Sequence, residues 1–263
     1  MNAIVLNTQR EARPMSGSAP ILTVENVRIS FGDMVAIDGI SLSVRHGEFV
    51  SLIGPSGCGK STLLKAIAGL VEPSAGRIAL ADPHLRVGFM FQKPLLLPWR
   101  TTLDNVLLPI ELQSGGRPGP ADRDKAHRML ELVQLADFAG AYPHQLSGGM
   151  QQRAALARTL VCDPDILLLD EPFGALDELT RDVLNEEMIG IWESGETRLS
   201  TVLMVTHSIP EAVAMSDRVV VLTPRPARLI EDVAIRELRP RQPENPDTAA
   251  ITRHIRDLIR QTR

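Results

Sequence analysis

The sequence predicts an α/β protein with a mostly parallel sheet, an antiparallel β lobe and a helical subdomain. Short and almost wholly apolar runs, typical of strands buried on both faces of a parallel sheet, occur at 49–53, 166–169, 202–205 and 219–222. Residues 27–44 instead alternate apolar and polar side chains, which is typical of antiparallel strands with two different faces. Helical periodicity in the stretch 94–162 predicts a helical subdomain within the α/β core.

Turn residues and periodicity locate the boundaries of these parts. Gly32 and Asp33 separate the two alternating stretches, and the glycine- and proline-rich residues 115–120 form a loop inside the helical part. Apolar residues on one face of a helix follow a proline-rich stretch at 240–246; they are Ile251, Ile255, Leu258 and Ile259. We therefore expect a flexible tail at 1–20, one domain at 21–240, and a hinge with an amphipathic helix at 241–263.

Composition excludes several classes of function. The net charge is −4 and aromatic residues make up 3%, whereas nucleic-acid-binding domains are normally basic and often rich in stacking side chains. The two cysteines, Cys58 and Cys162, have no metal-ligand spacing and indicate a reducing compartment. No apolar run reaches the roughly 18 to 20 residues that a membrane-spanning helix requires, and the tail lacks the apolar core of a signal peptide.

A glycine-rich loop between the first buried strand and a helix carries the strongest local signal. It matches the phosphate-binding pattern of two glycines separated by four variable residues and followed by Lys-Ser, and its residues are Gly54, Pro55, Ser56, Gly57, Cys58, Gly59, Lys60, Ser61 and Thr62. Glycines allow backbone N–H groups to surround phosphate oxygens, and the helix N-terminus adds a positive dipole. Lys60 would reach the β- and γ-phosphates, and the Ser61 hydroxyl would ligate Mg²⁺.

An acidic pair follows the second buried strand. Asp170 and Glu171 come directly after the run 166–169, so their carboxyl groups are expected at the carboxyl edge of the sheet, where ligands bind in such folds. Asp170 would hold the Mg²⁺ shell, and Glu171 would act as general base for the attacking water. An acidic pair alone could equally cap a helix, and its combination with the phosphate loop favours the catalytic interpretation.

The segment Leu146-Ser-Gly-Gly-Met-Gln-Gln-Arg153 closely resembles the signature sequence of ABC ATPases, and it stands shortly before the acidic pair as in that family. Ser147, Gly148 and Gly149 would open a helix whose N–H groups and hydroxyl form a second anion-binding terminus. The resemblance spans residues 21–222 and implies a P-loop ATPase core. Within it, Phe91 to Val106 resembles the branch that serves nitrate, sulfonate, taurine and pyrimidine-precursor uptake.

The resemblance also assigns roles to four further residues. Gln92 matches the glutamine that contacts Mg²⁺ and signals to the membrane subunit, and Asp177 matches the loop that passes between paired subunits. His207 matches the switch histidine that senses the γ-phosphate, although an isolated histidine after a strand is more often structural. Phe31 falls where the family places the aromatic ring that stacks on adenine, and its alternative is a core position.

The family resemblance implies an ATPase that uses ATP and Mg²⁺, with Glu171, His207 and Lys60 as the catalytic residues. Two copies would pair head to tail, each phosphate loop facing the partner's signature helix. The homodimer would lie on the cytoplasmic face of the inner membrane, bound to integral permease subunits and served indirectly by an extracytoplasmic solute-binding protein. Residues 94–99 would be either a groove wall for a permease helix or ordinary core.

Three functional classes fit such an ATPase. An importer subunit is favoured because no membrane helices are fused to the ATPase. An exporter subunit is the alternative, since some exporter ATPases are also separate chains. A soluble ABC ATPase that acts on DNA or ribosomes is less consistent with one cassette, a modest helical insert and an acidic balance. No residue encodes the transported solute, because this subunit does not contact it in the family.

Overall fold

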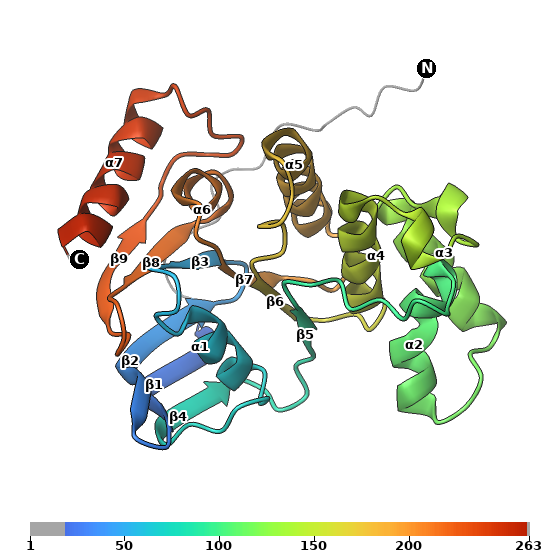
Figure 1. Cartoon of the computed structure of the whole chain (residues 1–263), viewed down its shortest axis with the longest axis horizontal. Coiled ribbons are helices and arrows are strands. Elements are labelled where there is room, and N and C mark those ends of the chain that lie inside the picture. Colours follow the sequence, from blue (N-terminus) through green and yellow to red (C-terminus); the bar gives the residue numbers. More distant parts are fainter. Residues whose placement is uncertain (1–18, 262–263) are drawn as a thin grey trace.

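The computed structural model describes residues 19–261 and contains two β-sheets with helices on both sides (Figure 1). The larger sheet has the order β5-β6-β7-β3-β8-β9, and all neighbours are parallel except β8 and β9. Its strands are β3 (Phe49–Ile53), β5 (Val87–Met90), β6 (Ile166–Asp170), β7 (Thr201–Val205), β8 (Arg218–Leu222) and β9 (Leu229–Ala234). The four predicted apolar runs are β3, β6, β7 and β8, and every residue in them is buried.

The second sheet is the predicted antiparallel lobe. Its order is β2-β1-β4, and its strands are β1 (Pro20–Phe31), β2 (Met34–Arg45) and β4 (Ala75–Leu80). Gly32 forms the turn between β1 and β2 with a φ of 57°, which glycine adopts without steric cost. The predicted tail falls almost entirely on residues 1–18, which lie outside the described residues, whereas Pro20 already begins β1.

The larger sheet is buried on both faces because its strands alternate their side chains between two core clusters. Ile166 and Leu168 pack with β1, β2 and α1 (Lys60–Ile67), which lies between the two sheets. Leu167 and Leu169 face the opposite cluster, which contains residues of the helical lobe and of α5 (Glu178–Ser194). One strand therefore joins both halves of the core, and the residues at its end have a fixed position.

The predicted helical part forms a lobe beside β5 and β6 (Figure 1). It contains α2 (Thr102–Ser114), α3 (Pro120–Leu132) and α4 (Gly148–Leu160), with short 3-10 helices η1 (Ala136–Phe138) and η2 (Pro143–Gln145). Thr101 caps α2 by accepting a hydrogen bond from the Asp104 amide, and Ser147 caps α4 by accepting one from the Met150 amide. These caps satisfy amides that the first turn leaves unpaired.

The C-terminal part packs on the other end of the large sheet. It comprises α6 (Ile209–Met215), β9 and α7 (Pro246–Gln261), and the predicted apolar face of α7 packs against β8 and α6 with Ile255 buried. The segment expected as a hinge is tied to α6, because the buried Arg241 guanidinium donates to the carbonyl oxygens of Val213 and Ser216 at 2.7 and 2.6 Å. Burial lowers the pKa of Arg241 to about 10.

Four elements were not anticipated from the sequence: β4, β5, β9 and α6. β4 and β9 are largely half-exposed or exposed, so they carry no apolar run, and β5 has only four residues. The helix α6 has seven residues, too few for a clear helical period. Within residues 19–261, no helix combines the length and the apolar character needed to cross a bilayer.

A glycine in β4 provides a test of the pairing between β1 and β4. Gly76 has a φ of 83°, and a Cβ there would lie 2.3 Å from the Asn26 carbonyl oxygen. We expect Gly76→Ala to lower the free energy of unfolding by about 2 to 4 kcal/mol. Alanine disfavours this positive φ, and the backbone must also shift so that the new methyl group does not clash with the Asn26 carbonyl oxygen. Urea unfolding measures the change.

The matched control is Gly190→Ala, since Gly190 lies in α5 with nothing within 4 Å of the added methyl group. That substitution should raise the free energy of unfolding by about 0.5 to 1 kcal/mol, because alanine favours the helix. Equal effects at both positions would contradict the assigned packing of Gly76.

Candidate active site at the carboxyl edge of the sheet

The predicted site residues gather where neighbouring parallel strands end. β3 runs into the glycine-rich loop, β6 ends at Asp170, β7 is followed by His207, and β5 is followed by Gln92. These strands are adjacent in the order β5-β6-β7-β3, so their carboxyl ends share one edge. In open α/β sheets this edge is the usual ligand site.

The glycine-rich loop wraps the N-terminus of α1. Gly57 and Gly59 have φ values of 72° and 124°, conformations that residues with a Cβ rarely adopt. The Lys60 side chain is only 5% exposed, and its Nζ donates to the carbonyl oxygens of Gly54 and Pro55 at 2.8 and 3.1 Å. The Cys58 side chain is buried beneath the loop, so of this residue only the backbone can face a ligand.

A hydroxyl and a carboxylate meet beside the loop. The Ser61 hydroxyl on α1 donates to Asp170 Oδ1 at 2.6 Å, and burial raises the pKa of the Asp170 carboxyl above its ordinary value. These are the hard oxygen ligands that Mg²⁺ prefers. Residues 19–261 contain no cluster of three His, Cys, Asp or Glu side chains that could enclose a metal. A cation at Ser61 and Asp170 would take its other ligands from water, from substrate oxygens or from a side-chain amide oxygen.

Glu171 is the centre of a second set of contacts. Its Oε2 accepts a hydrogen bond from Gln92 Nε2 at 3.2 Å and lies 3.2 Å from His207 Nδ1. Gly174 borders this group, where a Cβ would lie 3.4 Å from His207 Cε1 and 3.5 Å from Glu171 Oε2. The structure thus brings Glu171 together with Gln92 and His207, which are 115 positions apart in the sequence.

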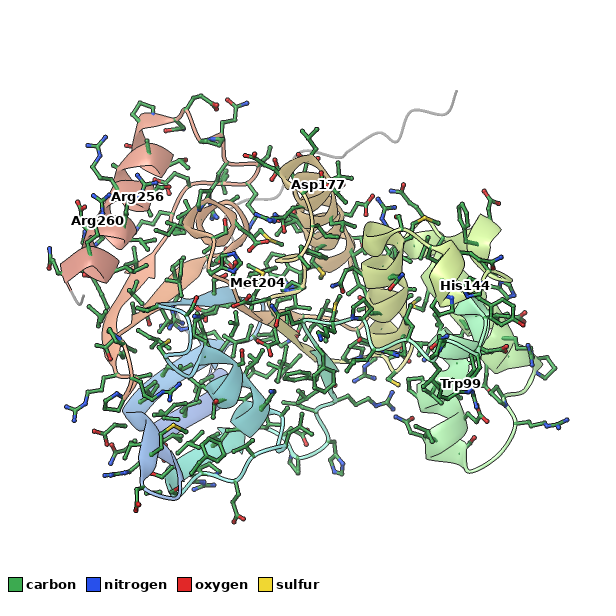
Figure 2. The ribbon with its side chains drawn as sticks, viewed as in Figure 1. Trp99, His144, Asp177, Met204, Arg256 and Arg260 are labelled. Atoms are coloured by element: carbon green, nitrogen blue, oxygen red, sulfur yellow. The ribbon has the colours of Figure 1, made fainter. Side chains whose placement is uncertain are left out.

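Other predicted site residues lie elsewhere in the chain. Ser147, Gly148 and Gly149 begin α4 in the helical lobe, where a Cβ on Gly148 or Gly149 would contact Leu176 or Thr180. Asp177 caps α5 (Figure 2), accepting from the amide and hydroxyl of Thr180 at 3.0 and 2.7 Å. The backbone hydrogen bond from Thr180, followed by that from its hydroxyl, lowers the pKa of Asp177.

Phe31 lies at the end of β1 with 49% of its surface exposed, so its alternative as a core residue is wrong. The segment 94–99 is divided between both interpretations: Leu96 packs partly against the core, whereas Leu95 and Trp99 are 56% and 71% exposed. Trp99 lies at the helical lobe, beside α2 (Figure 2).

Comparison with known proteins agrees with this geometry. The ABC transporter family profile matches residues 37–174. An aliphatic sulfonates import ATP-binding protein of Agrobacterium fabrum is 43% identical over 247 residues, covering 94% of this chain and 86% of its own. A taurine import ATP-binding protein of Rhizobium johnstonii is 45% identical over 203 residues, 74% of each chain. The chain belongs to the ABC transporter family.

Solved structures agree with that assignment. A dimeric ATP-binding cassette in a post-hydrolysis state, bound to ADP and Pi, is 32% identical with a TM-score of 0.70, covering 82% of this chain and all of its own. The predicted resemblance and fold class are thereby confirmed. The chain is an ATP-binding subunit and an ATPase of this family.

In the ABC ATPase, two side chains to which the sequence assigned no role tie Gln92 and the residues after it to the helical lobe. Gln152 on α4 donates from Nε2 to the Gln92 carbonyl at 2.9 Å, and Arg158 donates to the carbonyl oxygens of Pro94 and Leu95 at 2.6 and 2.8 Å. Both donors belong to the signature helix, so the segment after Gln92 lies fixed against it. Gln152 stands in the signature segment, but its contact with Gln92 has no local signal, and no local pattern distinguishes Arg158 from an ordinary polar helix residue.

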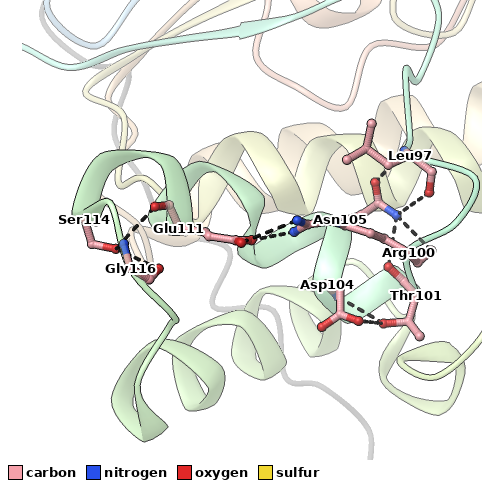
Figure 3. A network of polar contacts seen from close by, with 8 residues as sticks. All are labelled: Leu97, Arg100, Thr101, Asp104, Asn105, Glu111, Ser114 and Gly116. Carbon is pink, nitrogen blue, oxygen red and sulfur yellow. Dashed lines mark hydrogen bonds and ion pairs between the residues drawn. The ribbon is translucent and has the colours of Figure 1, made fainter.

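The loop that follows is held by one buried amide (Figure 3). Asn105 on α2 accepts from the Leu97 amide at 2.7 Å and donates to the carbonyl oxygens of Leu97, Arg100 and Thr101. Arg100 also pairs with Glu111, which lies further along α2, and this hydrogen bond lowers the pKa of Glu111. Trp99 therefore lies in a loop whose backbone is anchored on both sides of it, at Leu97 and at Arg100.

A buried carboxyl group supports the turn that carries His207. The Thr206 hydroxyl donates to Glu211, the Ser208 amide donates to Thr206 Oγ1 at 3.0 Å, and the Glu211 amide donates to the Ser208 hydroxyl at 3.3 Å. Glu211 is 7% exposed, and burial raises its pKa. The sequence analysis missed this residue, although Ser-x-x-Glu before a helix is a recognised capping pattern.

The raised pKa of Glu211 leads to a pH-dependent prediction. The folded protein binds the Glu211 carboxyl proton more tightly than the unfolded chain does. Its contribution to the free energy of unfolding is therefore largest at low pH, below the unfolded pKa, and is lost as pH rises through the raised pKa. Glu211→Gln stays neutral, so its Tm relative to wild type should increase between about pH 5 and pH 8. A difference of about 1 kcal/mol would change Tm by about 2 to 4 °C.

Thermal unfolding of both proteins across that range is the measurement, with Glu186→Gln on the exposed side of α5 as the control. The control should show no such trend. A constant offset between Glu211→Gln and wild type at every pH would contradict the assigned pKa direction.

Proposed function

We propose that this chain is the ATP-hydrolysing subunit that energises import of a sulfonate-type solute, taurine included, through a separate membrane permease. The observation that carries the proposal is the convergence of Gln92 and His207 on Glu171, next to the paired Ser61 and Asp170. This edge holds a carboxylate within hydrogen-bond distance of two polar side chains, and beside it a paired hydroxyl and carboxylate suited to a cation. Such a set suits phosphoryl transfer to water, in which positioning and charge stabilisation supply most of the catalysis.

The glycine-rich loop suits a triphosphate. Its inward N–H groups and the α1 N-terminus would hold the phosphate oxygens, and Lys60 would exchange the carbonyl oxygens of Gly54 and Pro55 for phosphate. Ser61, Asp170 and Gln92 would hold Mg²⁺, which supplies charge neutralisation to the phosphates when bound. The exposed ring of Phe31 offers an adenine-stacking face at the end of β1.

Glu171 is the proposed general base. Its side chain is about one-fifth exposed at 22%, so it can accept a proton from water at the edge of the sheet. Gln92 and His207 contact the same carboxylate oxygen and hold it in one orientation. His207 would then sense the γ-phosphate from the end of β7, on the turn that Thr206 and Glu211 stabilise.

A second copy of the chain would complete the site. The signature residues Ser147 to Gly149 and the cap residue Asp177 lie in the part of the molecule formed by α4 and α5, away from the phosphate loop (Figure 1). A head-to-tail homodimer would place each signature helix N-terminus opposite the partner's loop, and the two-fold symmetry would generate two equal sites. The dimeric cassettes among the similar structures support this arrangement.

The exposed side chains of Leu95 and Trp99 are the proposed contact for the permease. They follow Gln92 by three and seven residues, and the loop that carries them is tied to α4 and α2. Movement at the active site would reach the permease through this segment. The proposal places the dimer on the cytoplasmic face of the inner membrane, with an extracytoplasmic solute-binding protein. Relatives that serve sulfonate and taurine import favour this direction over export.

Glu171→Gln tests the catalytic assignment. Removing the base should lower the rate of ATP hydrolysis by about 10²- to 10⁴-fold while ATP binding is retained. Because ATP would then persist between two subunits, the variant should also elute as a dimer with ATP in size-exclusion chromatography. Glu186→Gln, an exposed acid-to-amide change on α5, should keep wild-type turnover. A Glu171→Gln monomer with normal turnover would remove the basis of the proposal.

Trp99→Ala tests the permease contact. An aromatic anchor at an interface typically contributes about 2 kcal/mol or more, so capture of the permease should fall by roughly 30-fold or more. ATP hydrolysis by the isolated subunit should stay at the wild-type level. Leu238→Ala, which removes a 65% exposed apolar side chain outside the helical lobe, should leave capture unchanged.

The measurement is capture of tagged Glu171→Gln protein with ATP from its own solubilised membranes, with and without Trp99→Ala, followed by mass spectrometry. A permease with a solute-binding protein supports import. A permease with no binding protein would favour the exporter alternative, and ribosomal or DNA-bound partners would overturn transport altogether.

A further inference from the structure

A guanidinium group from the loop between β8 and β9 contacts the phosphate loop. Arg225 donates from Nη2 and Nε to the Gly57 carbonyl oxygen at 2.7 and 3.2 Å. Its third nitrogen, Nη1, contacts the Met34 sulfur at the start of β2. No sequence motif and no part of the family resemblance includes this residue, which lies 168 positions after Gly57.

The β8–β9 loop is fixed in position by its own backbone. The Ala227 amide donates to the Ala36 carbonyl at 2.9 Å, and the Asp38 amide donates to the Ala227 carbonyl at 3.0 Å, so the loop lies along β2. The Thr223 hydroxyl accepts from the Arg228 amide at 2.9 Å and closes the turn. Arg225 therefore approaches Gly57 from an anchored loop rather than from a free surface chain.

The contact acts on the peptide that shapes the phosphate loop. Gly57 has a φ of 72°, and its carbonyl oxygen accepts both hydrogen bonds from the guanidinium. A carbonyl engaged in this way is held away from bound phosphates, so the neighbouring N–H groups stay available to them. A Cβ on Gly57 would itself lie 3.6 Å from Arg225 Nη2, which shows how closely the two residues approach.

The charge of Arg225 has no acidic partner among the described residues, since its contacts are a carbonyl oxygen and a thioether. A guanidinium without a carboxylate partner adds positive potential at the loop, where a polyanion would bind. Arg225 also contacts Met34, and Met34 pairs with Phe31 across the β1–β2 turn. One side chain thus links the phosphate loop to the strand end proposed to carry adenine.

We propose that Arg225 is a positioning residue of the nucleotide site, which holds the phosphate loop in its binding shape and aligns it with the β1–β2 turn. This inference rests on the proposed function, because it assumes that a nucleotide occupies the loop. The predicted consequence concerns affinity: Arg225 contacts neither the base Glu171 nor the Ser61–Asp170 pair, so the chemical step should be largely independent of it.

Arg225→Ala, Arg225→Lys and Arg228→Ala separate the possibilities. The first should raise KM for ATP and Kd for ADP by about tenfold, equivalent to about 1.4 kcal/mol, with kcat within about twofold of wild type. Arg225→Lys should recover part of the affinity, because it keeps the charge and one donor. Arg228 is the matched control: it lies on the same loop and pairs with Asp38, so its removal should change neither constant.

Steady-state ATPase kinetics and calorimetric titration with ADP provide the readouts, and thermal unfolding without nucleotide checks the fold of each variant. If Arg225→Ala is less stable, Arg225→Lys with wild-type Tm keeps the test valid. Wild-type ADP affinity in both Arg225 variants, or a loss confined to kcat, would overturn the inference. Failure of the wild-type protein itself to bind ADP would instead overturn the proposed function on which the inference rests.

Discussion

The shared carboxyl edge of β5, β6, β7 and β3 is the constraint on which the rest of the site depends. These strands are parallel and adjacent, and β3, β6 and β7 are buried along their whole length, so none can shift without exposing apolar side chains on one face. The residues that follow these strands are therefore held in fixed positions. Glu171 can contact both Gln92 and His207 at 3.2 Å because each stands directly beyond the end of a fixed strand.

Contacts from this edge continue into the helical lobe. Gln92 is joined through its side chain to Glu171 and through its carbonyl to Gln152 on the signature helix. Arg158 and Asn105 then hold the segment that leads to the exposed Trp99. A contiguous series of hydrogen bonds therefore connects the proposed base with the proposed permease contact. Such a series is a physical route for coupling between two sites, provided that the lobe has two arrangements.

Two polar side chains outside the recognised motifs support the candidate active site, the buried Glu211 and the exposed Arg225. Glu211 shapes the turn that carries His207, and Arg225 holds the outer carbonyl of the phosphate loop. Both belong to the last quarter of the chain, which contributes only His207 to the site residues recognised in the sequence. This part of the ABC ATPase thus supports the geometry of residues that the motifs supply.

The sequence alone determined the strands β3, β6, β7 and β8 and the antiparallel pair β1 and β2, because burial on two faces and alternation leave unmistakable patterns. It also determined the phosphate loop and the acidic pair, because close backbone turns and metal ligands require specific residue types at fixed spacing. The half-exposed strands β4 and β9 and the short helix α6 left no such pattern.

Only the tertiary structure decided which side chains meet. The contacts of Glu171 with Gln92 and His207, of Asn105 with the loop 97–101 and of Arg225 with Gly57 join residues through space, and polar side chains of these types occur throughout the sequence without any local signal. The exposure of Phe31 was likewise decided by the packing of β1, since an aromatic residue at a strand end suits core and surface equally.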